Sequence, residues 1–508
     1  MPALDLPRSF QHLSFADGVR AATKRDPNKI ALKHRKNTRT YAQFMERIDR
    51  VTSAIVGDLG YGPGDHGAIV SNNSIESLEI VIGASQAGLA LATVNPRLAA
   101  AEIVTICDDA EAKVAFVDAA SAEAIKDSQF ETVKRIMVIG PEFEDWIAQA
   151  APLAKPPVVN EWDVFTIPYT SGTTGIPKGV LVPHRSRVLS LFAMATEYGC
   201  YSPEDRFLAL APLCHGAGMI FGLAPVFFGG FVEILDRFDP EVLLKTLKAE
   251  NITGFFAVPT HFHGIFSLEN SILEANRAPA LHTIISNAAP LAQASKEQII
   301  DYFGSGMLHE SYGSTEAGIV SNLRPPDQLR KQRCVGQPFP MTLVKIVDDK
   351  GNECAPGEVG ELFSKSPYLF NGYWKRPEAT EAAFRGDWVT VEDLSKRDEE
   401  GHIYIVDRKK DMIISGGINI YPREIEEVLF KHPAIADVAV TGVPDEKWGE
   451  QIKAFVVRQP GGELSERDVI DFCKDKIADF KIPKAVDFLD ALPRNVGGKV
   501  LKRELRDD

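Results

Sequence analysis

The chain has 508 residues, of which 44% are hydrophobic and 25% charged. These values are typical of folded globular proteins, and the length predicts about three domain-sized units. The formal net charge of −14 argues against nucleic acid as a bulk partner, because phosphate backbones are bound by basic surfaces. The six cysteines are scattered and the N-terminus lacks a signal-peptide pattern, which predicts reduced thiols in a cytoplasmic protein.

Predicted strands and helices alternate along the first third of the chain, which favours a mostly parallel sheet covered by helices. Ser71–Ser74 supply good N-cap chemistry for a helix that starts at Ile75. In chain order we expect a largely helical segment 15–56 with a short strand 29–32, a strand 68–70, a helix 75–88, a strand 91–94, a helix 100–108, a strand 114–117 and an irregular excursion 141–160.

The segment 169–180 reads YTSGTTGIPKGV and lies between strands expected at 164–167 and 179–182. Its glycines let the backbone approach an anion, its hydroxyls add donors, and Lys178 adds a compact positive charge. These features predict a polyphosphate-binding loop. The loop is not of the Walker A type, because Gly179 stands where that motif has a hydroxyl. The alternative is a flexible surface turn.

Further along the chain, strands are expected at 207–210, 252–259 and 283–286, and the uncharged run 216–232 fits a buried core helix better than a membrane span. Ligands of open parallel sheets gather beyond the carboxyl ends of such strands. From about residue 335, short strands and glycine turns predict a small β-barrel or β-rich subdomain. A charged segment at 408–411 is the expected linker to a compact α+β unit. That unit is expected to contain a helix opened by Pro422, strands at 435–443 and 451–457, and a helix capped by Ser465.

Four more segments carry functional residue types. They read SNAAPL at 286–291, ESYGSTE at 310–316, SGGINIYPREIE at 415–426 and PRNVGGKVLKR at 493–503. In this order, and together with the loop at 169–180, they resemble the motifs of the adenylate-forming superfamily, which contains acyl-CoA synthetases, adenylation domains and beetle luciferases. The likeness spans essentially the whole chain and points to an acyl-CoA ligase of the 4-coumarate or fatty-acid type.

The resemblance implies that ATP and Mg²⁺ bind at the segment 310–316. Tyr312 would stack on adenine, Thr315 would meet the α-phosphate, and Glu316 would bind Mg²⁺, which prefers oxygen ligands. An ordinary strand-to-loop turn is the alternative for this motif. The implied ATP- or AMP-binding residues are Thr170, Ser171, Gly172, Thr173, Thr174, Gly175, Lys178, Ala288, Ala289, Pro290, Glu310, Ser311, Tyr312, Gly313, Ser314, Thr315, Asp393, Arg408 and Lys499.

The resemblance also implies an acyl pocket. Its expected residues are Cys214, His215, Met219, Asn287, Gly313, Ile319 and Val320. His215 matches a gate beside the substrate carboxylate and joins Lys499, Glu316 and Thr315 as a catalytic candidate. Asn287 replaces a family glycine and would narrow the pocket, donate a hydrogen bond or simply cap its loop. Apolar walls with one amide favour an aromatic or cyclic acid with a polar group, with a medium-chain fatty acid as the second candidate.

Two histidine patterns receive a simpler interpretation. A nucleophilic pair of Cys214 and His215 is disfavoured, because adjacent residues of an extended chain point in opposite directions. His261 and His263 are expected on one face, which suggests a metal, but no third ligand is evident in the sequence. We interpret them as plain pocket or core histidines.

The later motifs surround the expected linker. Asp393 and Arg408 would contact the ribose, since a carboxylate suits a vicinal diol. Glu392 and Asp407 replace the family glycines that precede them, which leaves the loop geometry open. By the same resemblance Lys410 is the hinge. Ser415, Gly416 and Gly417 would bind CoA, and Lys499 would bridge the substrate carboxylate and the α-phosphate.

The implied fold is α/β. A large N-terminal domain of parallel-rich sheets and helices is expected at 1–407, with the β-rich subdomain at about 335–407, a hinge at 408–412 and a small mobile α+β lid domain at 413–508. The implied activity is ligation of a small-molecule carboxylic acid to CoA through an acyl-adenylate, with ATP, Mg²⁺ and CoA. The alternatives are a standalone adenylation domain that loads a carrier protein and a luciferase-like oxygenase. The sequence leaves the acid and the oligomeric state open, a homodimer included.

Overall fold

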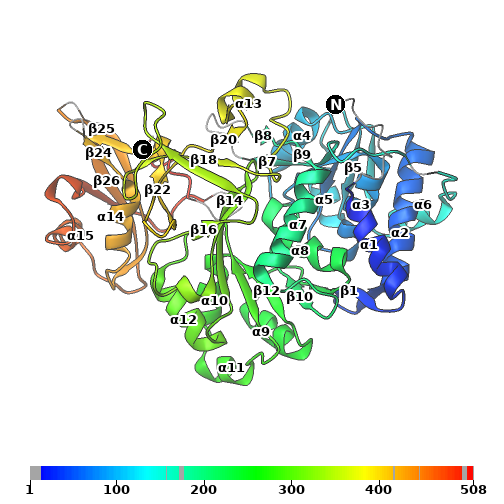
Figure 1. The fold of residues 1–508 in the computed structure, drawn as a ribbon, viewed down its shortest axis with the longest axis horizontal. Helices are drawn as coiled ribbons and strands as arrows, with labels where there is room; N and C mark the ends of the chain where they lie inside the picture. Colours follow the sequence, from blue (N-terminus) through cyan, green and yellow to red (C-terminus); the bar gives the residue numbers. More distant parts are fainter. Residues whose placement is uncertain are drawn as a thin grey trace. The chain divides into compact units, whose positions relative to one another are not determined.

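The computed structural model describes residues 13–155, 157–170, 177–415, 418–445, 447–494 and 500–506. The chain forms two compact units. Unit 1 comprises Met1–Leu343 and Ser364–Val389, and unit 2 comprises Val344–Phe363 and Thr390–Asp508. Both units combine helices and sheets (Figure 1), so the predicted α/β class is confirmed. The domain boundary expected at 407/408 stays a prediction.

The larger sheet of unit 1 has nine strands in the order β16-β15-β14-β13-β12-β10-β11-β1-β2. Each of the consecutive strands β14, β13, β12, β10, β11 and β1 runs parallel to the next in the sheet. β14 and β15 form an antiparallel pair. β11, β12 and β13 are buried along their whole length, as parallel strands between helices are. The strand bounds are β1 Ile30–His34, β2 Asn37–Thr40, β10 Arg206–Ala209, β11 Phe231–Ile234, β12 Gly254–Ala257, β13 Thr283–Ser286, β14 Leu308–Ser314, β15 Gly318–Leu323 and β16 Gln337–Pro338.

The second sheet of unit 1 has the order β6-β5-β3-β4-β7-β8, with β9 also paired to β7. Its strands from β6 to β7 are parallel. Their bounds are β3 His66–Val70, β4 Ala90–Val94, β5 Val114–Val117, β6 Arg135–Val138, β7 Val164–Thr170, β8 Lys178–Gly179 and β9 Val182–Pro183. The predicted phosphate loop therefore connects β7 to β8, two neighbouring strands of this sheet.

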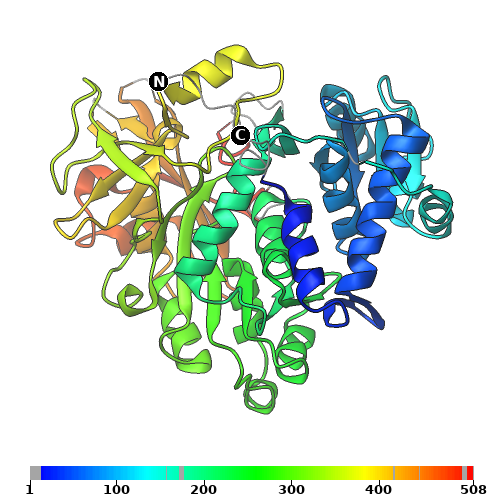
Figure 2. The ribbon, with the colours of Figure 1, turned by 45° about the vertical axis from the view of Figure 1, so that its right-hand side comes forward.

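Thirteen helices of unit 1 lie among the described residues. Their bounds are α1 Phe15–Arg25, α2 Tyr41–Ala54, α3 Ile75–Ala87, α4 Ala100–Asp109, α5 Ala119–Ala124, α6 Pro141–Gln149, α7 His184–Tyr198, α8 Gly216–Phe228, α9 Pro240–Ala249, α10 Pro259–Phe266, α11 Asn270–Ala275, α12 Gln293–Phe303 and α13 Pro377–Ala383. A π-helical turn, Ile55–Leu59, extends α2. Figure 2 shows the N-terminal helices in blue, where α1, α2 and α3 contact one another.

Two predictions for helices have different outcomes. The uncharged run 216–232 contains the buried helix α8, as predicted. Gly229 caps the C-terminal end of this helix with a left-handed φ of 98°. Within the described part of the chain, no helix is both long and apolar enough to cross a membrane. The irregular excursion expected at 141–160 is wrong at its start, because Pro141 opens α6. Phe143, Trp146 and Ile147 are buried at helical spacing, and α6 contacts α2.

Unit 2 combines short antiparallel strands with a compact α+β portion. In its C-terminal sheet the order is β24-β23-β26-β25, and β27 pairs with β26. Two strands contain residues of both units, β17 Leu343–Val347 and β18 Gly360–Lys365. The other bounds are β21 Asp393–Arg397, β22 Ile403–Arg408, β23 Ile413–Ser415, β24 Ile418–Ile420, α14 Pro422–Leu429, β25 Ile435–Asp445, β26 Gly449–Arg458, α15 Glu466–Cys473 and β27 Ala485–Phe488. β19 Phe384–Arg385 and β20 Trp388–Val389 form a hairpin in unit 1. Pro422 is the first residue of α14 and Ser465 caps α15, as predicted.

A mostly buried ion pair fastens the C-terminal segment 500–506 to α14. Lys502 Nζ lies 2.7 Å from Glu426 Oε1, and the two side chains are 15% and 14% exposed. Glu426 Oε1 also accepts a hydrogen bond from the backbone N–H of Val440 at 2.8 Å. Burial opposes the charge on Lys502, but Glu426 and Asp407 outweigh it and raise the lysine pKa. The pair therefore joins a helix, a strand and the end of the chain.

We expect Lys502→Met to lower the free energy of unfolding of unit 2 by about 3–5 kcal/mol, because the Glu426 carboxylate stays buried without its cation. Urea unfolding followed by circular dichroism measures this loss. The double variant Lys502→Met/Glu426→Gln removes both charges and keeps the acceptor for Val440, so it should recover most of the stability. A double variant as unstable as the single one would contradict this account.

Candidate functional site

The flanks of the predicted phosphate loop are paired strands. Thr170 ends β7 and lies opposite Lys178, the first residue of β8. The loop residues Ser171, Gly172, Thr173, Thr174 and Gly175 lie outside the described part of the chain. The register of β7 and β8 nevertheless brings the two ends of this loop together.

Tyr373 links Lys178 to Glu316, although the sequence analysis missed this tyrosine. The Lys178 ammonium lies 5.2 Å from the centre of the Tyr373 ring, and the tyrosine hydroxyl donates to Glu316 Oε1 at 2.9 Å. Tyr373 is held by an isolated β-bridge to Val180. Because these residues are far apart in sequence, no local pattern could have identified the tyrosine. The arrangement places a cation and a buried carboxylate on the same aromatic side chain.

The motif 310–316 forms the end of β14 and the turn into β15. A Cβ on Gly313 would lie 2.1 Å from the carbonyl oxygen of Gly318, so a side chain at this position would collide with the neighbouring backbone. The hydroxyl of Ser314 accepts a hydrogen bond from the backbone N–H of Ala317 at 3.0 Å and closes the turn. Thr315 and Glu316 therefore lie on a tight hairpin whose path is set by backbone contact.

Two residues of this motif make contacts inside the protein. Glu310 forms an ion pair with the fully buried Lys296 and accepts a hydrogen bond from the backbone N–H of Leu291 at 3.2 Å. The hydroxyl of Ser311 lies 2.6 Å from the Tyr198 hydroxyl and donates to Asn322 at 3.1 Å. The Glu310 contacts connect β14 to the loop before α12, and those of Ser311 connect it to α7 and β15.

The loop at 287–290, which is expected to contact the adenine, is open to solvent. Ala288, Ala289 and Pro290 are exposed. Ala288 has a left-handed φ of 76°, an uncommon conformation for a residue with a Cβ. The side-chain oxygen of Asn287 accepts a hydrogen bond from the backbone N–H of Ala288. Small side chains in this loop leave room for a flat ligand.

A cavity of about 160 Å³ lies beside this loop, entirely within unit 1. Its described lining residues are Arg187, Ser190, Gly216, Ala217, Ile220, Phe221, Asn287, Gly313, Ser314, Thr315, Gly318 and Ile319. Of the residues expected in the acyl pocket, Asn287, Gly313 and Ile319 line this cavity. Cys214, His215, Met219 and Val320 are not among its described lining residues. Arg187 was missed in the sequence, because an arginine on a helix gives no sign of burial.

The neighbouring Cys214 and His215 are suited to different roles. Burial raises the pKa of the Cys214 thiol to about 12, so the thiol is not a nucleophile at neutral pH. Burial and the positive charge of Arg97 lower the pKa of His215. His215 Nε2 lies 3.2 Å from the side-chain nitrogen of Asn95, and the residue is the N-cap of α8. A neutral imidazole therefore stands at the start of this helix.

The expected shared face of His261 and His263 is wrong. Both residues lie in α10, where positions two apart point to different sides. The His261 ring stacks on Phe238 at 4.3 Å between centroids, and His263 is exposed. The described residues contain no group of three or more potential metal ligands of the His, Cys, Asp and Glu types. All six cysteines are free and buried.

Unit 2 carries the residues expected to contact the ribose. Asp393 and Arg408 are register partners of β21 and β22, with Arg408 Nε 3.5 Å from Asp393 Oδ1. Glu392, which replaces a family glycine, has a left-handed φ of 63°. The chain thus keeps a glycine-like conformation there at a steric cost. Asp407, the second replacement, accepts a hydrogen bond from the backbone N–H of Arg423 at 3.0 Å in the first turn of α14.

Lys410 and Ser415 follow Arg408 closely along the chain. Lys410 lies in a short 3₁₀ helix, Lys409–Asp411, and its carbonyl accepts hydrogen bonds from Arg506 at 3.3 Å. Ser415 ends β23. The expected residues Gly416, Gly417 and Lys499 lie outside the described part of the chain.

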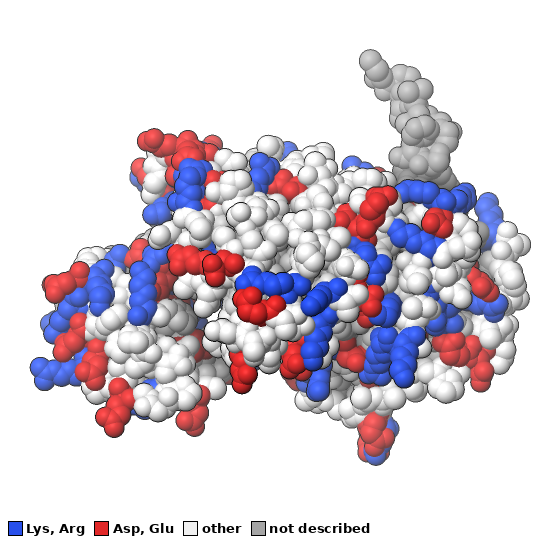
Figure 3. Space-filling model, turned by 90° about the horizontal axis from the view of Figure 1, so that it is seen from below, with Lys and Arg blue, Asp and Glu red and all other residues white. Residues whose placement is uncertain are grey.

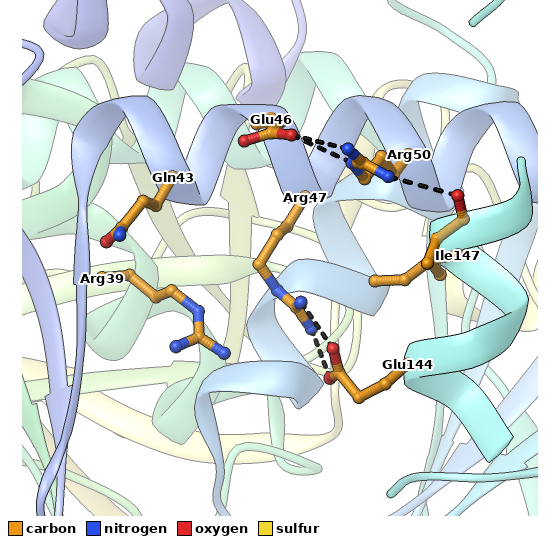
Figure 4. Close-up of a pocket in the computed structure, with 8 residues that line it drawn as sticks. Arg39, Gln43, Glu46, Arg47, Arg50, Glu144 and Ile147 are labelled. Atoms are coloured by element: carbon orange, nitrogen blue, oxygen red, sulfur yellow. Dashed lines mark hydrogen bonds and ion pairs between the residues drawn. The ribbon is translucent and has the colours of Figure 1, made fainter. Parts of the chain in front are cut away.

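A second cavity, of about 390 Å³, lies between α2 and α6 (Figure 4). Arg47 donates to both oxygens of Glu144 at 2.6 and 2.7 Å, and Arg50 donates to Glu46. Each arginine is thus matched by a carboxylate, and we interpret this cavity as part of a surface ion-pair network. Acidic and basic side chains are also intermixed on the face shown in Figure 3.

Comparisons with known proteins bear on the family and the fold of the chain. A family described as "AMP-binding enzyme" matches residues 19–374, and "AMP-binding enzyme C-terminal domain" matches residues 424–499. The chain is 33% identical to a 2-succinylbenzoate–CoA ligase of Geobacillus kaustophilus over 94% of this chain and 95% of that protein. ATP-bound MatB from Rhodopseudomonas palustris superposes with a TM-score of 0.89 at 29% identity, over 97% and 98% of the two chains. The o-succinylbenzoate CoA synthetase of Bacillus subtilis, in complex with ATP and magnesium, superposes with a TM-score of 0.85 at 28% identity, over 97% and 99%.

His309, beside Glu310 in β14, makes the stability of unit 1 depend on pH. It is 8% exposed, its Nδ1 lies 3.0 Å from the Asn322 side-chain nitrogen, and burial lowers its pKa to about 4. The unfolded chain binds a proton near the ordinary pKa of about 6.5, whereas the folded chain resists it. The stabilisation is therefore complete above pH 6.5 and is lost as the pH falls towards 4.

Between pH 6.5 and 4 the wild type should lose on the order of 3 kcal/mol of its free energy of unfolding through His309. We expect His309→Gln to abolish this pH-dependent loss. The readout is the midpoint of urea unfolding at several pH values in this range. His263→Gln is the matched control, because that histidine is exposed and should leave the pH dependence unchanged. An unaltered pH dependence in the His309 variant would contradict the assignment.

Proposed function

The chain belongs to the AMP-binding enzyme family and is an AMP-forming acid–CoA ligase, and we propose that its substrate is a compact aromatic or cyclic carboxylic acid with a polar group. The observation that carries the proposal is the cavity of about 160 Å³ beside Thr315. A protein cavity of similar size, about 150 Å³, binds benzene, so a single ring fits this volume better than a long chain. The name of the 2-succinylbenzoate relative supports an aromatic acid. A medium-chain fatty acid is the second candidate.

The reaction has two steps. The acid carboxylate attacks the α-phosphate of ATP, and pyrophosphate leaves. The CoA thiol then attacks the carbonyl of the acyl-adenylate, and AMP leaves as the thioester forms. The first step brings the carboxylate against the phosphate oxygens, and the second brings the thiol against the acyl-adenylate. The protein therefore assists mainly by positioning the reactants and by supplying positive charge.

Residues of unit 1 are assigned to the nucleotide phosphates and the acid. Lys178 and the loop after Thr170 would hold the phosphates, Tyr312 would contact adenine, and Thr315 would contact the α-phosphate at the edge of the cavity. Glu316 fits Mg²⁺, because one carboxylate oxygen accepts the Tyr373 hydroxyl and the other makes no hydrogen bond to a described residue. Mg²⁺ is commonly bound by one or two carboxylates together with substrate phosphates. When bound, the ion would neutralise phosphate charge.

Residues of unit 2 are assigned to the ribose, to CoA and to the change between the two steps. Asp393 and Arg408 would hold the ribose, and Ser415, Gly416 and Gly417 would accompany the pantetheine. Lys499 would bridge the carboxylate and the α-phosphate in the first step. A rotation about Lys410 would then withdraw Lys499 and admit CoA, a domain-scale gating movement.

We expect Lys499→Ala to slow acyl-adenylate formation at least about 100-fold, the scale of losing one strong transition-state donor. Thioester formation from supplied acyl-adenylate should survive, because Lys499 is assigned to the first step alone. Pyrophosphate release measures the first step and thioester yield the second. Equal loss of both steps would refute this division of roles.

The function itself is tested with purified protein, ATP, Mg²⁺ and a panel of aryl, cinnamic, cyclic and fatty acids. AMP and thioester are measured with and without CoA, and the expected result is CoA-dependent turnover on ring-containing acids. Preference for fatty acids would overturn the substrate class but not the reaction. Acyl-adenylate that forms without any thioester would indicate loading of a carrier protein instead.

A further inference from the structure

Arg187 is a buried cation that faces the acyl cavity. It lies in α7, is 8% exposed and lines the cavity beside Thr315 and Asn287. No hydrogen bond or ion pair connects its guanidinium to any residue that the structure describes. The ordinary position for an arginine is at the surface or against a carboxylate, because removing an unpaired charge from water costs several kcal/mol. Arg187 therefore calls for an anionic partner that the described protein does not supply.

One buried and one mostly buried lysine of this protein show the usual arrangement. Lys296 is fully buried and forms an ion pair with Glu310, and Lys502 forms one with Glu426. Burial lowers the pKa of Arg187 to about 10, which still leaves the guanidinium charged at neutral pH. The difference between Arg187 and the two lysines is therefore the missing carboxylate, and not the burial.

The surroundings of Arg187 reinforce its positive charge. Its Nη2 lies 3.4 Å from the position that a Cβ on Gly216 would occupy, at the first residue of α8. The N-terminus of a helix carries partial positive charge and favours anions. The other described lining residues of the cavity are uncharged. A guanidinium and a helix N-terminus thus act on one small space without a described carboxylate to balance them.

We propose that the acid substrate carries a second carboxylate, which pairs with Arg187 while the reacting carboxylate lies near Thr315. This inference rests on the proposed function and makes the polar group of the substrate anionic. Arginine suits the role because its planar fork donates two parallel hydrogen bonds to a carboxylate. The cavity volume of about 160 Å³ limits the substrate to a compact diacid, either a short α,ω-dicarboxylic acid or a single ring with two carboxylates.

The test compares diacids with their own neutralised forms. Malonic to suberic acid and the benzene dicarboxylic acids are assayed beside their monoamides and monomethyl esters, by pyrophosphate release from wild type, Arg187→Met, Arg187→Lys and Arg185→Met. Arg185 is the matched control, because it lies two positions earlier and forms an ion pair with Glu161 at 2.7 Å. It is not among the described lining residues of the cavity. Using a series of chain lengths makes the test independent of the span between the two carboxylates.

The wild type should prefer at least one diacid over its monoamide by about 30-fold or more in kcat/KM, the scale of a charge-assisted pair in a desolvated site. Arg187→Met should lose this preference while it keeps activity on the neutral forms. Arg187→Lys should keep part of the preference, and Arg185→Met all of it. Wild type that prefers the neutral forms would overturn the inference. So would an Arg187→Met variant that loses diacid and neutral forms equally, because Arg187 would then serve the reacting carboxylate.

Thermal unfolding separates this inference from the proposed function. Arg187→Met should unfold at the same or a higher temperature than wild type, because the substitution removes a buried unpaired charge. The preferred diacid should raise the unfolding temperature of wild type and of Arg185→Met, but not that of Arg187→Met. If no acid yields AMP, the proposed function fails, and this shift alone decides the inference. A diacid shift that persists in Arg187→Met would overturn it.

Discussion

The close contact of β14 with β15 is the constraint on which the candidate site depends. Gly313 and Gly318 approach so closely that a single added carbon would meet a carbonyl oxygen at 2.1 Å. This contact sets the hairpin that carries Thr315 and Glu316 and forms one wall of the cavity beside Thr315. The preceding residues hold the strand in place through Lys296, Leu291 and Tyr198. The site is therefore a property of a rigid strand end more than of a flexible loop.

Charge is arranged differently in the supports and in the site. The supporting ion pairs, Lys296 with Glu310 and Lys502 with Glu426, are internally matched, and each joins elements that are separate in sequence. Near the expected ligands, by contrast, the balance is incomplete. Arg187 has no described partner, and Glu316 has one oxygen without a described hydrogen-bond donor. Incomplete balance costs stability in the free protein, and a ligand of the opposite charge recovers that cost.

Local chemistry explains which parts of the fold could be predicted from the sequence. Pro422 and Ser465 determine helix starts through their own backbone and side-chain geometry, and the buried strand at 283–286 follows from its apolar run. The helix α6 was missed because its buried residues, Phe143, Trp146 and Ile147, lie among acidic ones and before a proline-rich stretch. His261 and His263 were assigned the two-residue period of a strand, because β12 ends just before them. They lie in α10, where the period is that of a helix.

The geometry around the candidate site follows from the sequence only where neighbouring residues or consecutive strands act together. The segment 310–316 forms one hairpin end, and Asp393 and Arg408 meet as register partners of the consecutive strands β21 and β22. Tyr373 and Arg187 could not be found in this way. Tyr373 reaches Glu316 across more than fifty positions of sequence, and the importance of Arg187 lies in a partner that is missing. A missing partner has no sequence pattern, since only the packed structure shows that no described carboxylate pairs with this arginine.

The two replaced family glycines show that a motif can keep its geometry while its residues change. Glu392 adopts the left-handed backbone that a glycine would take without strain, and it is held by a hydrogen bond from its N–H to the Thr390 hydroxyl at 3.0 Å. Asp407 uses its carboxylate for the first turn of α14. Asp407 thus adds a side-chain contact that glycine cannot make, whereas Glu392 is held through its backbone. The register of Asp393 with Arg408 is formed between them. Arg187 lines the cavity in unit 1 and is a separate feature from this pair of strands in unit 2, which carries the residues assigned to the ribose.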